Sequence, residues 1–148
     1  GGTSADMGNA VFVAAMLELP TMAFFTKMSE KINCGTLIKF SILMFVVKHA
    51  LTYFATNMIM IYLAQVCQMF AYALFVPASV YYVNKKIAVA DRVKGQSLVT
   101  TSMTLSGVFA NFAGGIMLDA LGVGHVLLAG VVLSIVGAVI VISMTEKV

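Results

Sequence analysis

The chain has 148 residues, of which 61% are hydrophobic and 10% are charged, and its formal net charge is +3. A soluble domain carries roughly 25% charged residues. So low a charge content excludes a soluble domain of this size and indicates an integral membrane protein. The basic residues stand in short clusters between apolar runs, which relates them to membrane topology and gives no reason to expect a nucleic acid partner.

Five long apolar runs follow one another along the chain. A helix needs about 20 apolar residues to cross a hydrocarbon core of ~30 Å. We therefore predict transmembrane helices over 9–27, 36–55, 58–84, 97–118 and 123–144. None of these runs alternates with the period of two that a barrel strand shows. The sequence predicts an all-α integral membrane fold. Because the chain does not begin with Met, we interpret it as part of a longer protein.

The connections between the runs differ in charge. Lys and Arg residues occupy the first connection, the third connection and the C-terminus: Lys27, Lys31, Lys85, Lys86, Arg92, Lys94 and Lys147. The second and fourth connections have none. By the positive-inside rule, the N-terminus lies outside and the C-terminus is cytoplasmic in a multi-pass protein of the plasma or inner membrane. A gating role for "ADRVKG" (90–95) is the less favoured interpretation of the third connection.

Several polar side chains fall at one depth of the predicted bundle. Counting inward at 1.5 Å per residue places Glu18 roughly 13 Å below the outer surface, and Lys48 and Gln65 about 11 Å below it. Gln68 comes out at about 15 Å and Asn111 at about 11 Å. Ionisable groups inside spans cost about 2.5–3.5 kcal/mol each and usually face the interior of a bundle. A common level in four helices predicts a site between them.

The helical faces agree with these depths. The third run has a polar stripe at i, i+3, i+7 and i+14, formed by Gln65, Gln68, Tyr72 and Ser79. The fourth run has a stripe at i, i+4, i+7 and i+11, formed by Thr100, Thr104, Gly107 and Asn111. We predict that these stripes line a cavity; bonds from helix to helix, worth about 0.6 kcal/mol each, are the alternative. The fifth run has only small residues at this spacing and is predicted to be a packing helix.

Glu18 and Lys48 have matching depth and opposite charge, so we expect them to approach each other across the first two helices. The alternatives are a protonated Glu18 bonded to neighbouring backbone, and a Lys48 side chain that extends to the membrane surface. His49 lies about 100° around the helix from Lys48 and is predicted to be a packing residue. Pro20 and Pro77 each leave a carbonyl without its helical donor, which predicts two helix kinks.

The sequence offers no motif for a cofactor, a metal or catalysis. Cys34 lies beside a short loop and Cys67 lies deep in an apolar run, so we expect no disulfide between them. No paired intramembrane aspartates and no Ser/His arrangement occur. We expect no cofactor and no enzymatic activity.

Three segments resemble a known family. "GNAVFVAAMLELPTMAFFTKMSEKI" is similar to the eighth helix of major facilitator superfamily transporters and its following loop. "AVADRVKGQS" resembles their basic loop between helices ten and eleven, and "GVFANFAGGIMLDALG" the end of helix eleven. The resemblance implies helices eight to twelve of a C-terminal six-helix bundle, in a secondary transporter that moves a small polar solute by alternating access. Its partners would be the lipid bilayer and an absent seventh helix and N-terminal bundle.

The resemblance is nearest to lactose permease-like symporters of sugars, nucleosides and aromatic acids. It implies that Glu18 and Lys48 correspond to functional charged residues of helices eight and nine. The His and Glu of helix ten correspond to Gln68 and Ala71 in one register, or to Tyr72 and Phe75 in another. Neither register supplies a titratable pair, so coupling to protons would use Glu18 or groups outside this chain. The competing hypothesis is a five-helix membrane protein with a structural or assembly role.

Overall fold

The computed structural model describes residues 3–146, except for the side chain of Met7. In that part, all regular structure is helical: α1 (Ser4–Lys31), α2 (Cys34–Tyr53), α3 (Met58–Lys86), α4 (Arg92–Leu121) and α5 (Val123–Met144), with a 3₁₀ turn, η1 (Val89–Asp91), before α4. All five α-helices are long and apolar enough to cross a membrane. This confirms the predicted all-α fold with five apolar helices. α1 and α4 extend several residues beyond the predicted runs at both ends.

Local sequence signals explain where the helices begin and end. At the start of α1, the Thr3 hydroxyl accepts a hydrogen bond from the Asp6 backbone N–H, and the Asp6 carboxylate accepts one from the Thr3 backbone N–H. The Asn57 side chain caps α3 by accepting a bond from the Met60 N–H at 3.0 Å. Gly122 separates α4 from α5 with φ +80°, a left-handed conformation that favours glycine.

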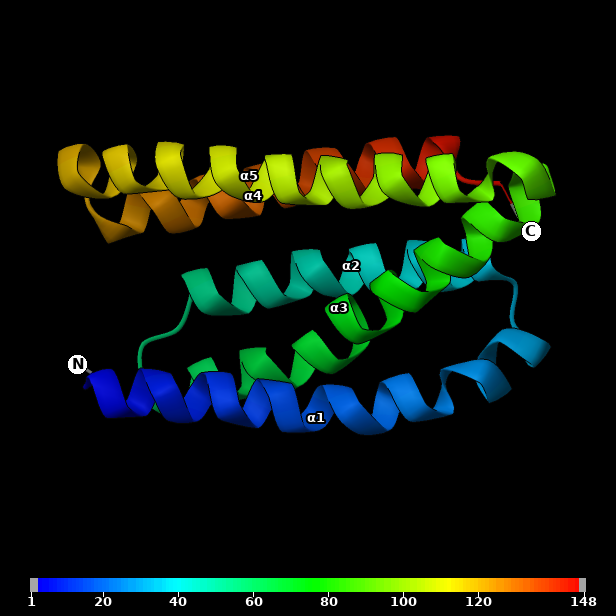
Figure 1. Ribbon diagram of the computed structural model, residues 1–148. Helices are drawn as coiled ribbons and strands as arrows, with labels where there is room; N and C mark the ends of the chain where they lie inside the picture. Colours follow the sequence, from blue (N-terminus) through cyan, green and yellow to red (C-terminus); the bar gives the residue numbers. More distant parts are fainter. Residues whose placement is uncertain (1–2, 147–148) are drawn as a thin grey trace.

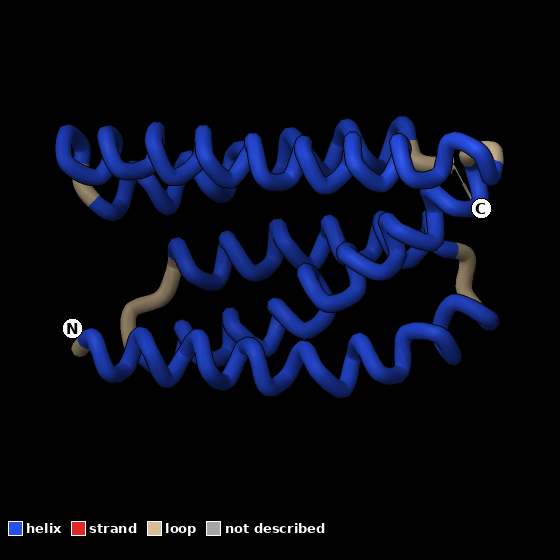
Figure 2. The backbone as a smooth tube through the Cα atoms, viewed as in Figure 1, coloured by secondary structure: helices blue, strands red, loops and turns tan. Residues whose placement is uncertain are grey.

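The helices run alternately up and down, and α3 crosses obliquely between α1 and α2 (Figure 1). α3 packs against both of these helices, whereas α1 and α2 share few contacts in the described part of the chain. α5 packs on α2, and α4 lies beside α5. The short connections all lie at the two ends of the bundle (Figure 2). The start of α1 and the end of α5 therefore lie at opposite ends of the bundle (Figure 1).

The connections that contain Lys and Arg lie at one end of the bundle. The α1–α2 loop, the α3–α4 connection and the end of α5 share this end (Figure 1). We call it the basic end, because these segments include Lys27, Lys31, Lys85, Lys86, Arg92 and Lys94. The α2–α3 loop, the α4–α5 junction and the start of α1 form the opposite end and have no Lys or Arg among their described residues. Lys147 lies outside the described residues.

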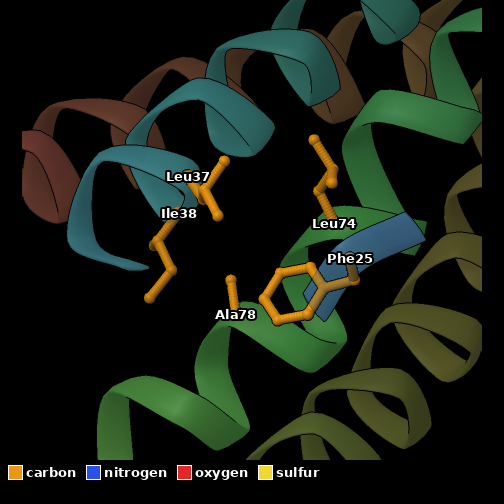
Figure 3. Close-up of a cluster of buried hydrophobic side chains, with 5 residues drawn as sticks. All are labelled: Phe25, Leu37, Ile38, Leu74 and Ala78. Carbon is orange, nitrogen blue, oxygen red and sulfur yellow. The ribbon is translucent and has the colours of Figure 1, made fainter. Parts of the chain in front are cut away.

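The apolar core lies in the half of the bundle nearer the basic end. It is built by Phe25 of α1, Leu37 and Ile38 of α2, and Leu74 and Ala78 of α3 (Figure 3). Lipid tails are as apolar as these side chains, so close packing and not exclusion from water holds such helices together. The core therefore fixes the relative positions of α1, α2 and α3.

α4 is attached far less closely. Its one buried residue is Gly95, which lies against Val83 and Ile87 where α3 turns into α4. Further along, a groove of about 870 Å³ separates α4 from α2 and α3. The groove is lined by Phe45, His49, Tyr72 and Phe75 on one side and by apolar and small residues of α4 on the other.

The segment after α5 is fixed at the basic end. The Glu146 carboxylate forms an ion pair with Lys86, and the Glu146 backbone N–H donates to the Tyr82 hydroxyl at 3.3 Å. The Glu146 carbonyl lies so close to Gly35 that a side chain at that position would collide with it. Gly35 is needed here for close approach of backbone to backbone. The segment thus holds the end of α5 against α2 and α3.

Candidate functional site

Lys48 lies on the face of α2 that packs against α3. Cys34, Ser41 and Lys48 recur at seven-residue intervals, so their side chains lie on nearly the same side of the helix. Cys34 and Ser41 are both 0% exposed. Lys48, at the end of this stripe, is half-buried. The cation is directed into the bundle and does not extend along the helix surface.

The Lys48 ammonium donates a hydrogen bond to Gln68 Oε1 of α3 at 2.6 Å. On α3, Gln68 stands between Ala64 and Ala71, which are 0% exposed and let α2 and α3 approach closely. A hydrogen bond to a charged group contributes about 1.5–3 kcal/mol. That is comparable with the roughly 2.5–3.5 kcal/mol cost of a charge at the centre of a membrane helix. The bond thus offsets much of the cost of placing Lys48 here.

Glu18 approaches the same region from α1. Ala14, Glu18, Thr21 and Phe25 follow one another at spacings of four, three and four, and so share one helical face. Ala14, Thr21 and Phe25 are buried, and Glu18 between them is half-buried. Because α1 packs against α3, this face is directed at α3. Glu18 and Lys48 therefore face α3 from two sides.

Glu18 and Lys48 form no direct ion pair in the part of the chain that the structure describes. Among residues 3–146, ion pairs join Lys86 to Glu146 and Lys94 to Asp91. α3 packs against both α1 and α2, and the Lys48 ammonium donates its hydrogen bond to Gln68 of α3. The approach of Glu18 to Lys48 across α1 and α2 stays a prediction.

Gln65 lies one turn from Gln68 toward the opposite end. It lines a pocket of about 450 Å³ between α1 and α3, together with Thr3 and Ser4 at the start of α1, and Ala10, Val11, Met58 and Ile61. The pocket has the size of a small-molecule site. Gln65 is thus the residue of the predicted polar stripe on α3 that lines this pocket, whereas Lys48 and Gln68 do not line it.

Tyr72 and His49 both line the groove beside α4. The Tyr72 side chain is exposed. The His49 ring stacks on Phe45, and its Nδ1 donates to the Phe45 carbonyl at 2.8 Å. Its Cδ2 also faces Gly130 of α5. His49 thus points away from Lys48, and its contacts agree with the packing role predicted for it.

Asn111 lies apart from the other site residues. It is exposed on α4, and its Nδ2 donates to the Gly107 carbonyl of the same helix at 2.9 Å. Thr104 likewise donates to the Thr100 carbonyl at 3.0 Å. The predicted stripe on this helix therefore bonds to its own backbone. The structure brings Lys48 of α2 and Gln68 of α3 together. Gln65 is also on α3, Glu18 is on the face of α1 that packs against α3, and Asn111 is exposed on α4.

Helices α1 and α3 continue through Pro20 and Pro77. Proline has no N–H, so the carbonyls of Met16 and Ala73 lose their helical donors. Pro20 is two residues from Glu18, and one of the freed carbonyls thus lies near the charged level. The kinks themselves stay predictions.

The small residues of α3 are a feature that the sequence reading missed. Ala64, Ala71 and Ala78 recur at seven-residue intervals and are all 0% exposed. This alanine repeat could have been found by looking for small residues at helix-packing spacing, as on the fifth run. Small residues at this spacing allow neighbouring helices to approach α3 closely.

Within residues 3–146, both cysteines are free and no cluster of three or more His, Cys, Asp or Glu could hold a metal ion. A family model described as Major Facilitator Superfamily matches residues 1–147. Searches of curated proteins and of solved structures gave no match.

Proposed function

Because the chain belongs to the Major Facilitator Superfamily, a family of transporters and not of enzymes, we propose that it forms five helices of the C-terminal bundle of a secondary transporter. The transporter moves a small polar solute across the plasma or inner membrane. The family match favours this function over a structural or assembly role. The observation that carries the site is the bond between Lys48 and Gln68 within a packed helix interface.

The solute binds at the level of Lys48. Lys48 and Gln68 contact it from α2 and α3, Gln65 contacts it from the adjoining pocket, and Glu18 from α1. Tyr72 and Asn111 contribute where α3 and α4 face the rest of the transporter. Transport proceeds by alternating access, in which two bundles rock around a site near the midplane. If transport is coupled to protons, Glu18 or groups outside this chain exchange them.

The groove beside α4 is the position of the seventh helix. Its walls on α2, α3 and α4 are mainly apolar, with few polar groups, and α4 has only one buried residue. A helix placed there would cover Tyr72 and Phe75 and hold α4 against the rest of the bundle. The N-terminal bundle then faces the completed six-helix unit. Sequence upstream of Gly1 that encodes about seven further spans is expected.

The basic end is the cytoplasmic end. The connections with Lys and Arg lie together there, as the positive-inside rule requires. The N-terminus of α1 is then outside and the C-terminus cytoplasmic. Labelling of single cysteines introduced at Thr56 and at Ala88 tests this, because only the cysteine at 56 should react with an impermeant reagent in intact cells.

Uptake of a panel of labelled sugars, nucleosides and organic acids by the full-length protein, with and without a protonophore, tests the function. Lys48→Gln is expected to reduce uptake at least about tenfold, since it removes a charge-assisted bond. Lys39→Gln, on the same helix near the basic end, is the matched control and should retain uptake. No uptake of any labelled solute by a correctly inserted protein would contradict the proposal.

A further inference from the structure

We propose that the solute carries a single carboxylate group, which binds the Lys48 ammonium beside Gln68. This inference rests on the proposed transport function and names the substrate class of its site. It comes from the hydrogen-bonding capacity that the two residues leave unused, from the charges around them, and from the pocket that lies one helical turn away along α3.

The Lys48–Gln68 pair offers more donors than acceptors. An ammonium has three N–H donors and no acceptor. The Gln68 atom that faces Lys48 must therefore be the amide oxygen, as the 2.6 Å bond has it. This bond uses one of the two lone pairs of the amide oxygen, and it leaves two N–H groups on Lys48 and the amide NH₂ of Gln68 as donors. A complementary ligand group must accept hydrogen bonds, and a carboxylate does so through two oxygens.

The charge at this point is not neutralised by contact. Gln68 is neutral, and among residues 3–146 no carboxylate lies within ion-pair distance of Lys48. A cation directed into a membrane bundle is stabilised most by an anion that bonds to it directly. The carboxylate of a solute supplies both the charge and the acceptors that the protein itself leaves out.

Glu18 limits the solute to one negative charge. It lies on the face of α1 that packs against α3. A carboxyl group there disfavours a second carboxylate on the solute, and its oxygens accept bonds from a hydroxyl or amino group. A small monocarboxylate with a hydrogen-bond donor at its other end therefore fits better than a dicarboxylate or an uncharged sugar.

The pocket between α1 and α3 gives such a solute a route. It opens near the start of both helices, has a volume of about 450 Å³, and includes Gln65 in its wall. Gln68 lies one helical turn beyond Gln65. A small monocarboxylate in this pocket lies beside Gln65. It must move about one further helical turn along α3 to meet Lys48, because Lys48 and Gln68 do not line the pocket.

Thermal unfolding of the purified full-length protein with acetate and acetamide tests the inference, with chloride at equal ionic strength as the reference. Acetate is the smallest probe with a carboxylate, and acetamide has the same shape without charge. Acetate should raise Tm above the chloride reference, and its half-maximal concentration should be at least about tenfold lower than that of acetamide. Benzoate and benzamide repeat the comparison with a larger skeleton.

Variants connect the effect to Lys48. Lys48→Gln should make acetate and acetamide equal, and Lys48→Arg, which keeps the charge, should retain the preference. Gln68→Glu places a carboxylate of the protein beside Lys48, so it should abolish the acetate effect without leaving a charge unpaired. It also remains informative where Lys48→Gln fails to fold. Lys39→Gln should behave like the wild type.

The inference is overturned if acetate stabilises no better than chloride or acetamide, or if Gln68→Glu retains the acetate effect. Its failure differs from failure of the transport function. If the protein takes up an uncharged solute but shows no acetate effect, the carboxylate inference is wrong and the proposed transport function stands. If acetate stabilises the protein in a way that depends on Lys48 but no labelled solute is taken up, the carboxylate site is supported and the proposed transport function is contradicted.

Discussion

The two halves of the α1–α2–α3 unit are packed in opposite ways. Toward the basic end, Phe25, Leu37 and Leu74 fill the space between the helices with large apolar side chains. Toward the opposite end, the small Ala64 and Ala71 bring α2 and α3 together around a charged hydrogen bond. The same three helices thus have a permanent apolar core in one half and a polar, ligand-accessible level in the other.

This difference follows from what each packing can do. Large interdigitated side chains fix the helices in position but leave no room for a solute. Small residues allow close backbones, and a lysine among them retains donors that a solute can use. We therefore assign the stability of the unit to the apolar half and the proposed binding site to the polar half. Variants that change one half and spare the other test this division.

Leu74→Ala should have the largest effect on stability. Leu74 is 0% exposed in the apolar core, and removing such a side chain costs about 2–5 kcal/mol of unfolding free energy. Thermal unfolding in detergent measures the loss. Leu133→Ala on the exposed surface of α5 is the control and should change stability far less. Equal effects at the two positions would show that the apolar half is not the source of stability.

Ala71→Leu should damage the polar half with a smaller loss of stability. A larger side chain at this 0% exposed position separates α3 from α2, at a cost of about 1–3 kcal/mol. Separation lengthens the Lys48–Gln68 bond, so acetate should lose its stabilising effect even in protein that remains folded. Leu74→Ala, by contrast, should keep the acetate effect. If Ala71→Leu binds acetate as the wild type does, the proposed division between an apolar and a polar half is wrong.

The ion pair at the basic end should make a small, pH-dependent contribution. The hydrogen bond from Lys86 holds the pKa of the Glu146 carboxyl below its ordinary value of 4.5. The contribution is therefore present above pH 4.5 and is lost as the pH falls through the lower folded-state pKa. Tm of the wild type should fall slightly more than that of Glu146→Gln when the pH is lowered below 4.5. Parallel curves would show that the pair contributes nothing.

Asn111→Ala should have the smallest effect. The side chain is exposed and bonds only to the Gly107 carbonyl of its own helix. Unfolding free energy should change by less than about 0.5 kcal/mol, and the acetate effect should persist. A loss of uptake with unchanged acetate binding would assign Asn111 to the contact with the rest of the transporter and not to the carboxylate.

The amino-acid sequence by itself determined the number and type of the elements. Runs of about 20 apolar residues can satisfy their backbone in a membrane only as helices, so length and composition suffice to predict them. The helical spacing also identified Lys48 and Gln68 as polar residues of one level. These inferences depend on local periodicity alone, and the structure has both residues in direct contact.

Only the tertiary structure decided which polar residues meet. Depth could not reveal that α3 packs against both α1 and α2, or that the Lys48 ammonium bonds to Gln68. Nor could the stripe on α4 show that Asn111 bonds within its own helix. Which helices are neighbours, and how closely they approach, depends on packing among residues distant in the chain, and a pattern within one helix does not contain that information.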